Sequence, residues 1–557
     1  MNYRKLYIYL IAVLSVLASC SDDILDTKPL DGYSEIDVFA DEALLRNYVN
    51  GTYRGFRHPF DNENSLTDGL TDNAFNQHGS AEGTIKTYTR AEVNPSNGEG
   101  ITRSLWATAY AYIRRTNVYF EGTVDSQINE EALSVMDGEM RFIRAFLYFD
   151  LLRWYGGVPL ITTTFELDDE NMAVSRNSSE EIASFIVEEC DLAIEELLSV
   201  ADGDYELGRA SIEAAMALKA RTLLYIASPL YNEEGDMSRW QAASDANQAV
   251  MELSTVSLVQ AADNPNAYGE LFTADFTEEA IFSRYFTEVN NQGYGVNTWL
   301  FPNSNGGWAN TTPSQDLVDS YELTNGNLPS NPESGYDDQD PYVNRDPRFY
   351  QTILYNGAPF KDAEYEYFLD INDPTNSALA GKDSRYSTIS AHNASRTGYN
   401  FRKWVQEDEG EYSGNTGPWI IFRKAEFYLN YAEAQIALGN ESEARTAINE
   451  VRERVGMPPL TVSGEELVER YRNERRVELV LEDHRFFDVR RWTIAPEEFS
   501  ETVTGVNVYK DGDDYVYSYD LITDDTKVWE DRMYFLPIPI DEVQRSGNSL
   551  EQNPGYQ

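Results

Sequence analysis

Residues 425–458 read AEFYLNYAEAQIALGNESEARTAINEVRERVGMP and contain two helical segments joined by one short turn. Gly439 is suited to end the first segment, and Asn440 can cap the start of the second. Ala432 in the first segment and Ala444 in the second are small enough to let two antiparallel helices pack closely, as in tetratricopeptide repeats. This stretch therefore predicts a tetratricopeptide-like helical hairpin.

Helical periodicity also dominates the chain before residue 255. Apolar residues recur at steps of three and four, a spacing that places them on one face of a helix. Ser178 and Glu181 form a capping-box pattern at the start of one such segment. We therefore expect a mostly α-helical chain whose scaffold consists of about four helical hairpins. The periodic segments are 41–56, 104–120, 139–155, 181–198, 211–228 and 239–253.

The middle of the chain, 256–420, has a different composition. It is rich in Asn, Gly, Tyr, Pro and Asp, and its helical periodicity is poor. A structureless linker of this length is unusual inside a compact protein, so we expect a loop-rich lobe that folds onto the helical scaffold and carries functional residues. The expected organisation is a signal peptide at 1–19, an N-terminal helical part at 20–255, the lobe at 256–420, and C-terminal hairpin helices with a closing segment at 421–557.

The N-terminus has the pattern of a bacterial lipoprotein signal peptide. Arg4 and Lys5 precede the apolar run 6–16, which is too short to span a bilayer. Small residues then stand directly before Cys20, as in a lipobox. We expect Cys20 to be the first mature residue and to be lipidated, because two or three acyl chains anchor a protein stably. An ordinary signal peptide followed by a chance cysteine is the alternative.

The charge and the rare residue types narrow the possible classes of protein. The chain carries 94 acidic and 44 basic residues, a net charge of −50, and such a surface repels phosphate backbones, so we expect no nucleic-acid partner. The four histidines show no metal-ligand spacing, and we expect no cofactor. Asp337, Asp338 and Asp340 could bind calcium, but a solvated acidic turn is the favoured interpretation. Cys190 lies on an apolar helical stripe, which predicts a buried, inert thiol.

A dense block of arginines and carboxylates lies near the C-terminus. Arginine–carboxylate pairs along one helix can build a structural network between packed helices, and we favour this interpretation over a catalytic one. Catalytic signatures such as G-x-S-x-G are absent from the sequence, so we expect no enzymatic activity. The block consists of Arg472, Glu474, Arg475, Arg476, Glu478, Glu482, Arg485, Asp488, Arg490 and Arg491.

Several blocks of sequence resemble one known family. The segments FRKAEFYLNYAEAQIALGN, YRNERRVELVLEDHRFFDVRRW and YFLPIPIDEVQRSGNSLEQNPGY, together with RFIRAFLYFDLLRWYGGVPL further upstream, are similar to the RagB/SusD family of outer-membrane nutrient-uptake lipoproteins. The resemblance covers nearly the whole mature chain, with the blocks in the right order. It implies a surface-exposed lipoprotein of the cell outer membrane, with a tetratricopeptide-like scaffold, that serves a SusC-like TonB-dependent outer-membrane channel.

Two loop regions combine flat aromatic rings with amide and carboxylate groups, which suit sugar C–H faces and hydroxyls. The first lies at 293–308 and contains glycines that allow tight turns. The second lies at 66–80, a position that resembles a ligand-contacting loop of the family. Alternatively, the tryptophans only fasten the first loop to the scaffold. The candidate ligand-binding residues are Trp299, Trp308, Tyr294, Asn297, Asp72 and Asn76.

The sequence thus predicts a nutrient-binding surface lipoprotein that captures an oligosaccharide and delivers it to a channel. A receptor for peptides or other nutrients in the same type of complex is the first alternative. A surface glycosidase that uses two of the many carboxylates is the second.

Overall fold

The computed structural model describes residues 35–58, 66–78, 85–97, 104–165, 174–262, 264–287, 295–410, 414–499 and 502–556. Cys20 and Tyr294 lie outside these residues, so the predictions made for them stay predictions. Among the described residues, no helix has the length and apolar character that crossing a bilayer requires.

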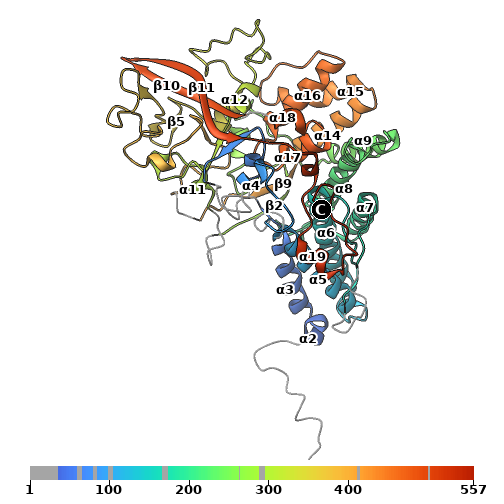
Figure 1. Cartoon of the computed structure of the whole chain (residues 1–557). Coiled ribbons are helices and arrows are strands. Elements are labelled where there is room, and N and C mark those ends of the chain that lie inside the picture. The colour runs from blue at the N-terminus through green and yellow to red at the C-terminus, as the bar shows by residue number, and fades with distance from the viewer. Residues whose placement is uncertain are drawn as a thin grey trace, which may run out of the picture.

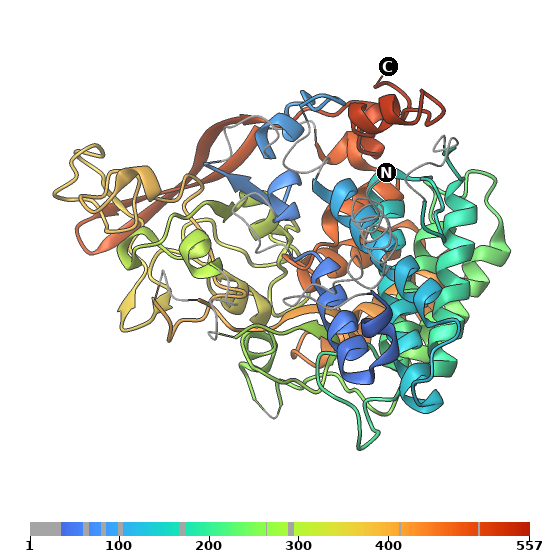
Figure 2. The ribbon, with the colours of Figure 1, turned by 90° about the horizontal axis from the view of Figure 1, so that it is seen from below.

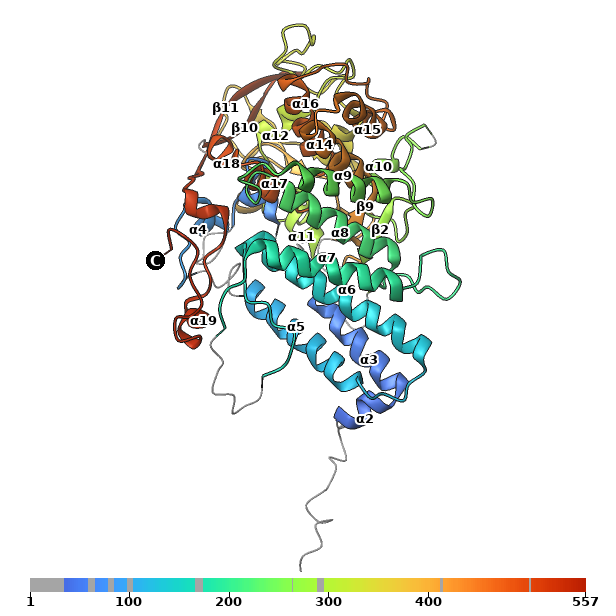
Figure 3. The same cartoon turned by 90° about the vertical axis from the view of Figure 1, so that its right-hand side faces the viewer.

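Antiparallel helices packed side by side form one half of the molecule (Figures 1 and 3). From α5 onward each helix packs against the next, and α9 packs against α14 although most of the lobe separates them in sequence. The prediction of a mostly helical chain built on tetratricopeptide-like hairpins is confirmed. These helices are α2 (Glu35–Ala40), α3 (Glu42–Thr52), α5 (Ser104–Thr123), α6 (Glu130–Tyr155), α7 (Ser179–Glu196), α8 (Ile212–Ala227), α9 (Met237–Met251), α14 (Lys424–Ala437), α15 (Glu441–Glu453) and α16 (Glu465–Glu478).

Most of the local features that predicted these helices are present in the structure. The exception is Asn440, which stands at the start of α15 but makes no capping hydrogen bond, because its side-chain amide donates to the Gln435 side chain at 2.8 Å. Ser178 and Glu181 form the capping box at the start of α7. Gly439 has a φ of +80°, a left-handed conformation that suits glycine and ends α14. Ala432 and Ala444 are fully buried where α14 meets α15, so their small side chains allow the close approach of the two helices. Cys190 is also fully buried, and burial raises the pKa of its thiol, as expected of an inert core residue.

Short elements connected by long loops form the other half of the molecule, on the left in Figure 2. Strand β2 pairs with β9, β4 with β8, and β5 with β6, all antiparallel. The β2–β9 pair ends where α14 begins and so ties the lobe to the scaffold. The elements are α10 (Ala267–Glu270), β2 (Ala280–Arg284), α11 (Val296–Leu300), η6 (Asn303–Asn305), β3 (Thr311–Pro313), α12 (Gln315–Ser320), α13 (Pro347–Thr352), β4 (Ile353–Leu354), β5 (Pro359–Phe360), β6 (Ala363–Glu364), β7 (Leu369–Asp370), η7 (Ala391–Asn393), β8 (Asn400–Phe401) and β9 (Trp419–Arg423).

A long β-hairpin near the C-terminus was not predicted. Strands β10 (Thr502–Asp511) and β11 (Asp514–Thr526) pair antiparallel, and β10 also pairs with β7 of the lobe. The alternating residues in VNVYKDGDDYVYSYDL and its Asp-Gly turn were a sufficient signal for a hairpin.

Short elements complete the two ends of the chain. Those near the C-terminus are α17 (Arg485–Arg491), α18 (Ala495–Glu498), η8 (Asp531–Tyr534) and α19 (Ile540–Arg545). Those near the N-terminus are η2 (Tyr53–Gly55), η3 (Thr67–Leu70), β1 (Ala74–Asn76) and α4 (Ile85–Thr89).

A buried network of ion pairs connects α16 with the lobe. Glu478 is fully buried and pairs with Arg348, Arg423 and Arg454. Glu474 pairs with Arg348 at 2.5 Å. Removing one member of such a network would leave its partner charged and buried, which is strongly destabilising. The structural interpretation of the charged block is thus supported: its members are largely buried, and most of them form ion pairs with charged side chains of other elements.

Candidate functional site

The two loop regions singled out in the sequence lie side by side in the structure. Strand β1 pairs with β3 so that Asn76 is opposite Thr311 and Ala74 is opposite Pro313. The pairing continues beyond the strands, because the Gln77 amide N–H donates to the Asn310 carbonyl oxygen at 2.8 Å. The residues that follow β1 therefore lie against those that precede β3, which include Trp308.

Backbone hydrogen bonds fix both tryptophans of this region. The Trp308 N–H donates to the Thr298 carbonyl at 2.7 Å, and the Asn310 N–H donates to the Trp299 carbonyl at 2.7 Å. The turn before Trp308 requires glycine, because a Cβ at Gly307 would lie 2.2 Å from a carbonyl oxygen of the chain. Both indole rings are half-buried. The structure therefore fixes the backbone of both residues and leaves part of each side chain exposed.

Two imidazoles accompany Trp308. The His78 ring lies edge-on to Trp308, with centroids 6.3 Å apart, and its other neighbour is His392 at 4.7 Å. The Gln77 side-chain amide donates to the Trp308 carbonyl oxygen at 2.6 Å and so fastens the loops together. His392 belongs to η7 and is exposed. We call Trp308, His78 and His392 the aromatic platform.

The sequence analysis did not select either histidine of the platform. His78 lies within the second predicted loop region, 66–80, so its proximity to Asn76 and Gln77 was a usable signal. His392 had none, because it lies more than 300 residues from His78 in the chain and only the folded lobe brings the two rings together. Trp299 lies outside the platform, half-buried and packed on the main hydrophobic core.

The predicted polar partners lie beneath the surface. Asn297 is fully buried: its side-chain amide donates to the Gln406 carbonyl at 2.9 Å, and its side-chain oxygen accepts from the Gln406 N–H at 3.0 Å. Asn76 is 1% exposed and donates to the Thr311 hydroxyl. Both amides therefore hold the loops in place, and the structure does not favour them as groups that touch a ligand.

Asp72 also has a structural position. Its carboxylate accepts two hydrogen bonds from Arg485, at 3.0 and 2.7 Å, and lies 2.8 Å from the Arg476 guanidinium. Burial alone would raise the pKa of Asp72, but the two guanidinium groups lower it well below its usual range. Asp72 is therefore an ionised anchor that ties the second loop to α16 and α17, and its carboxylate is engaged by these two guanidinium groups.

Asp68 is a buried carboxyl group whose pKa is shifted in the opposite direction, upward. It lies in η3, beneath the same loop, and accepts a hydrogen bond from the Asn73 side-chain amide at 2.8 Å. Burial raises the pKa of Asp68 to about 6, because desolvation outweighs this hydrogen bond. The loop that leads to His78 of the platform therefore contains a carboxyl group, Asp68, whose pKa lies in the mildly acidic range.

The acidic turn considered for calcium is on the surface. Asp337, Asp338 and Asp340 are exposed, and Asp337 accepts a hydrogen bond from the Gln339 backbone N–H at 2.9 Å. Within the described ranges, no three His, Cys, Asp or Glu side chains are grouped so that they could hold a metal ion.

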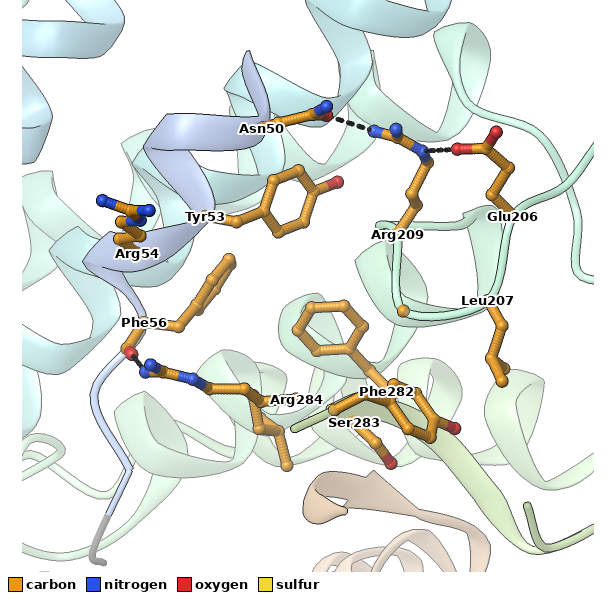
Figure 4. Close-up of a pocket in the computed structure, with 13 residues that line it drawn as sticks. Asn50, Tyr53, Arg54, Phe56, Glu206, Leu207, Arg209, Phe282, Ser283 and Arg284 are labelled. Carbon is orange, nitrogen blue, oxygen red and sulfur yellow. Dashed lines mark hydrogen bonds and ion pairs between the residues drawn. The ribbon is translucent and has the colours of Figure 1, made fainter. Parts of the chain in front are cut away.

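A pocket of about 340 Å³ lies elsewhere, between η2, the loop before α8, and β2 (Figure 4). Its apolar wall includes Phe56 and Phe282, while the charged groups around it are largely engaged. Arg209 pairs with Glu206 at 2.5 Å and donates to Asn50 at 3.0 Å. Arg54 at the rim is exposed and makes no ion pair with any described residue. We regard the aromatic platform as the better candidate site, because the pocket contains no comparable set of exposed, fixed rings.

Two family models and one known protein match this chain over much of its length. The family model described as "SusD family" matches residues 278–556, and the one described as "Starch-binding associating with outer membrane" matches residues 23–224. SusD-like protein P2 of Formosa agariphila is 24% identical over 99% of this chain and 100% of its own length.

Solved structures extend the comparison to the fold. A SusD-like protein from Bacteroides fragilis superposes with a TM-score of 0.78 at 31% identity, covering 95% of this chain and 100% of that one. A SusD-like carbohydrate-binding protein from the same species superposes with a TM-score of 0.76 at 27% identity, covering 92% and 99%. The match to a family model over half of the chain, and to solved members over nearly all of it, establishes that this chain belongs to the SusD family.

Proposed function

We propose that this protein binds a carbohydrate at the aromatic platform. The observation that carries the proposal is the position of Trp308: its half-buried ring lies edge-on to His78, which in turn lies against His392, and backbone hydrogen bonds hold the loop that carries it. A sugar ring can place its C–H face against an indole, and neighbouring imidazoles can exchange hydrogen bonds with hydroxyls. Because the ring is already fixed, binding costs little ordering of the protein.

Membership of the SusD family supports the same function. The Bacteroides fragilis relative is described as carbohydrate-binding, and another structural neighbour as laminarin-binding. We extend the proposal to the setting of the protein: lipidation at Cys20, attachment to the outer membrane with the protein facing outward, and transfer of the bound glycan to a SusC-like TonB-dependent channel. In this proposal the protein recognises its ligand and breaks no bond.

Affinity electrophoresis of the purified protein in gels that contain single polysaccharides tests the proposal. We expect at least one polysaccharide to retard the wild-type protein and to retard Trp308→Ala much less. Retention of peptides with no retention of any polysaccharide would favour the peptide receptor. Release of reducing ends from the retained polysaccharide, abolished by one carboxylate substitution, would favour the glycosidase.

A further inference from the structure

Basic groups surround the platform on a protein that is otherwise strongly acidic. Only about one charged residue in three is basic in this chain. Nevertheless, Arg396 follows His392 of the platform by four residues, and the Lys86 ammonium lies over the ring of Phe75, three residues before His78. Both cations are among the charged groups that act on His78, together with its imidazole neighbour His392. Burial is the main reason that the pKa of His78 is lowered, and these three neighbours lower it further. Two basic side chains are therefore carried by segments that form or adjoin the platform.

The two permanent cations of this group are not neutralised by the described residues. Arg396 is exposed and forms no ion pair with any described carboxylate. The Lys86 ammonium lies 5.6 Å from the centre of the Phe75 ring and likewise has no acidic partner in the described part of the chain. In contrast, the buried arginines of the scaffold, such as Arg423 and Arg348, each bond to two or more carboxylates.

Cations without an acidic partner, placed near a surface on which a sugar ring can stack, favour binding of a sugar that carries negative charge. A carboxylate or sulfate forms stronger, charge-assisted hydrogen bonds with guanidinium and ammonium groups than a hydroxyl does. At physiological salt the Debye length is about 8 Å, so the distant acidic surface is largely screened and the nearest cations dominate the interaction. We propose that the platform takes an anionic glycan, with one sugar ring on Trp308 and its carboxylate or sulfate group paired with Arg396 and Lys86. This inference rests on the proposed function, because it names the substrate class of the same site.

Matched polysaccharides and matched variants test the inference. The probes are polygalacturonate with its carboxyl-reduced form, and a sulfated galactan with its desulfated form, in affinity gels and in titration calorimetry. The variants are Arg396→Gln and Lys86→Gln. Arg54→Gln is the control, since it removes an equally exposed and unpaired arginine at the rim of the separate pocket in Figure 4.

We expect an anionic member of at least one pair to bind at least tenfold more tightly than its neutral form. Each platform variant should weaken binding of the anionic probe about tenfold, reduce its dependence on salt concentration and leave the melting temperature unchanged, whereas Arg54→Gln should change nothing. Equal binding of the neutral and anionic forms, lost in Trp308→Ala but kept in Arg396→Gln and Lys86→Gln, would overturn this inference and leave the proposed function intact. If no probe of either kind bound while a neutral polysaccharide retarded the protein in the affinity gels, the inference would fail and the proposed function would stand.

Discussion

Arg485 holds Asp72 through two parallel hydrogen bonds of 3.0 and 2.7 Å, although 412 residues separate the two in the chain. Arg485 begins α17, and Asp72 precedes β1, the strand that leads to His78. Because both side chains are buried, the bond fixes the position of the loop beneath the platform relative to the C-terminal helices. The stability of the protein and the geometry of its candidate site are therefore coupled through this pair.

Asp72→Asn should lower the free energy of unfolding at pH 7 by about 3 kcal/mol, because it leaves the buried Arg485 and Arg476 guanidinium groups without a carboxylate. The pKa of Asp72 is lowered in the folded protein, so its contribution is present above the unfolded pKa of about 3.9 and is lost as pH falls below it. Urea unfolding at several pH values measures the difference between the two proteins.

The difference in unfolding free energy between wild type and Asp72→Asn should shrink below pH 4. The exposed Asp337→Asn substitution provides the matched control and should change stability by less than about 0.5 kcal/mol. A difference in unfolding free energy that stayed constant from pH 7 to pH 3 would contradict the conclusion that Asp72 is an ionised carboxylate with a lowered pKa in the folded protein.

Asp68→Asn should have the opposite pH dependence. The pKa of Asp68 is raised to about 6 in the folded protein, so the folded state keeps the proton more tightly than the unfolded state. The wild type should therefore lose stability relative to Asp68→Asn as pH rises from about 4 to about 6, by as much as about 3 kcal/mol for a shift of about two pH units. Parallel unfolding curves of the two proteins over this range measure the effect, and no change in their difference would show that folding does not raise the pKa of Asp68.

Trp308→Ala should weaken binding of the retained polysaccharide at least tenfold, about 1.4 kcal/mol, because it removes the stacking surface. The melting temperature should change little, since the ring is only half-buried. Trp404→Ala is the contrasting variant: Trp404 is fully buried, and its loss should cost about 3–5 kcal/mol of stability. A large fall in melting temperature for Trp308→Ala with unchanged affinity would instead identify this ring as a structural plug.

Trp299→Ala separates the two tryptophans that the sequence placed together. Trp299 packs on the main hydrophobic core, and among the described residues its ring makes no contact with the rings of the platform. We expect a smaller loss of affinity than for Trp308→Ala and a larger loss of stability. Calorimetric titration and thermal unfolding of both variants measure these quantities, and the reverse order would place the ligand over Trp299.

Cys20→Ser should prevent lipidation, because the thiol carries the acyl chain in a lipoprotein. Fractionation of cells that produce the variant should find the protein unprocessed or released from the outer membrane. Persistent association of a processed Cys20→Ser protein with membranes would contradict the lipid anchor.

The sequence by itself determined the helical scaffold. Apolar residues at steps of three and four, the capping box of Ser178, and Gly439 between α14 and α15 are local features, and a helix forms from hydrogen bonds within one short segment. The same features did not reveal that α9 packs against α14, because the segments that would bury their apolar faces are far apart in the sequence.

The composition of the loops also identified the two regions that form the candidate site, but only the tertiary structure decided which of their side chains face solvent. An asparagine or aspartate can bind a ligand or satisfy buried backbone and guanidinium groups, and nothing in its neighbouring residues distinguishes the two. The pairing of β1 with β3 brings His78 to Trp308, while Asn297 and Asp72 turn inward to bond with Gln406 and Arg485. These contacts join segments more than a hundred residues apart, so they depend on the folding of the whole lobe onto the scaffold.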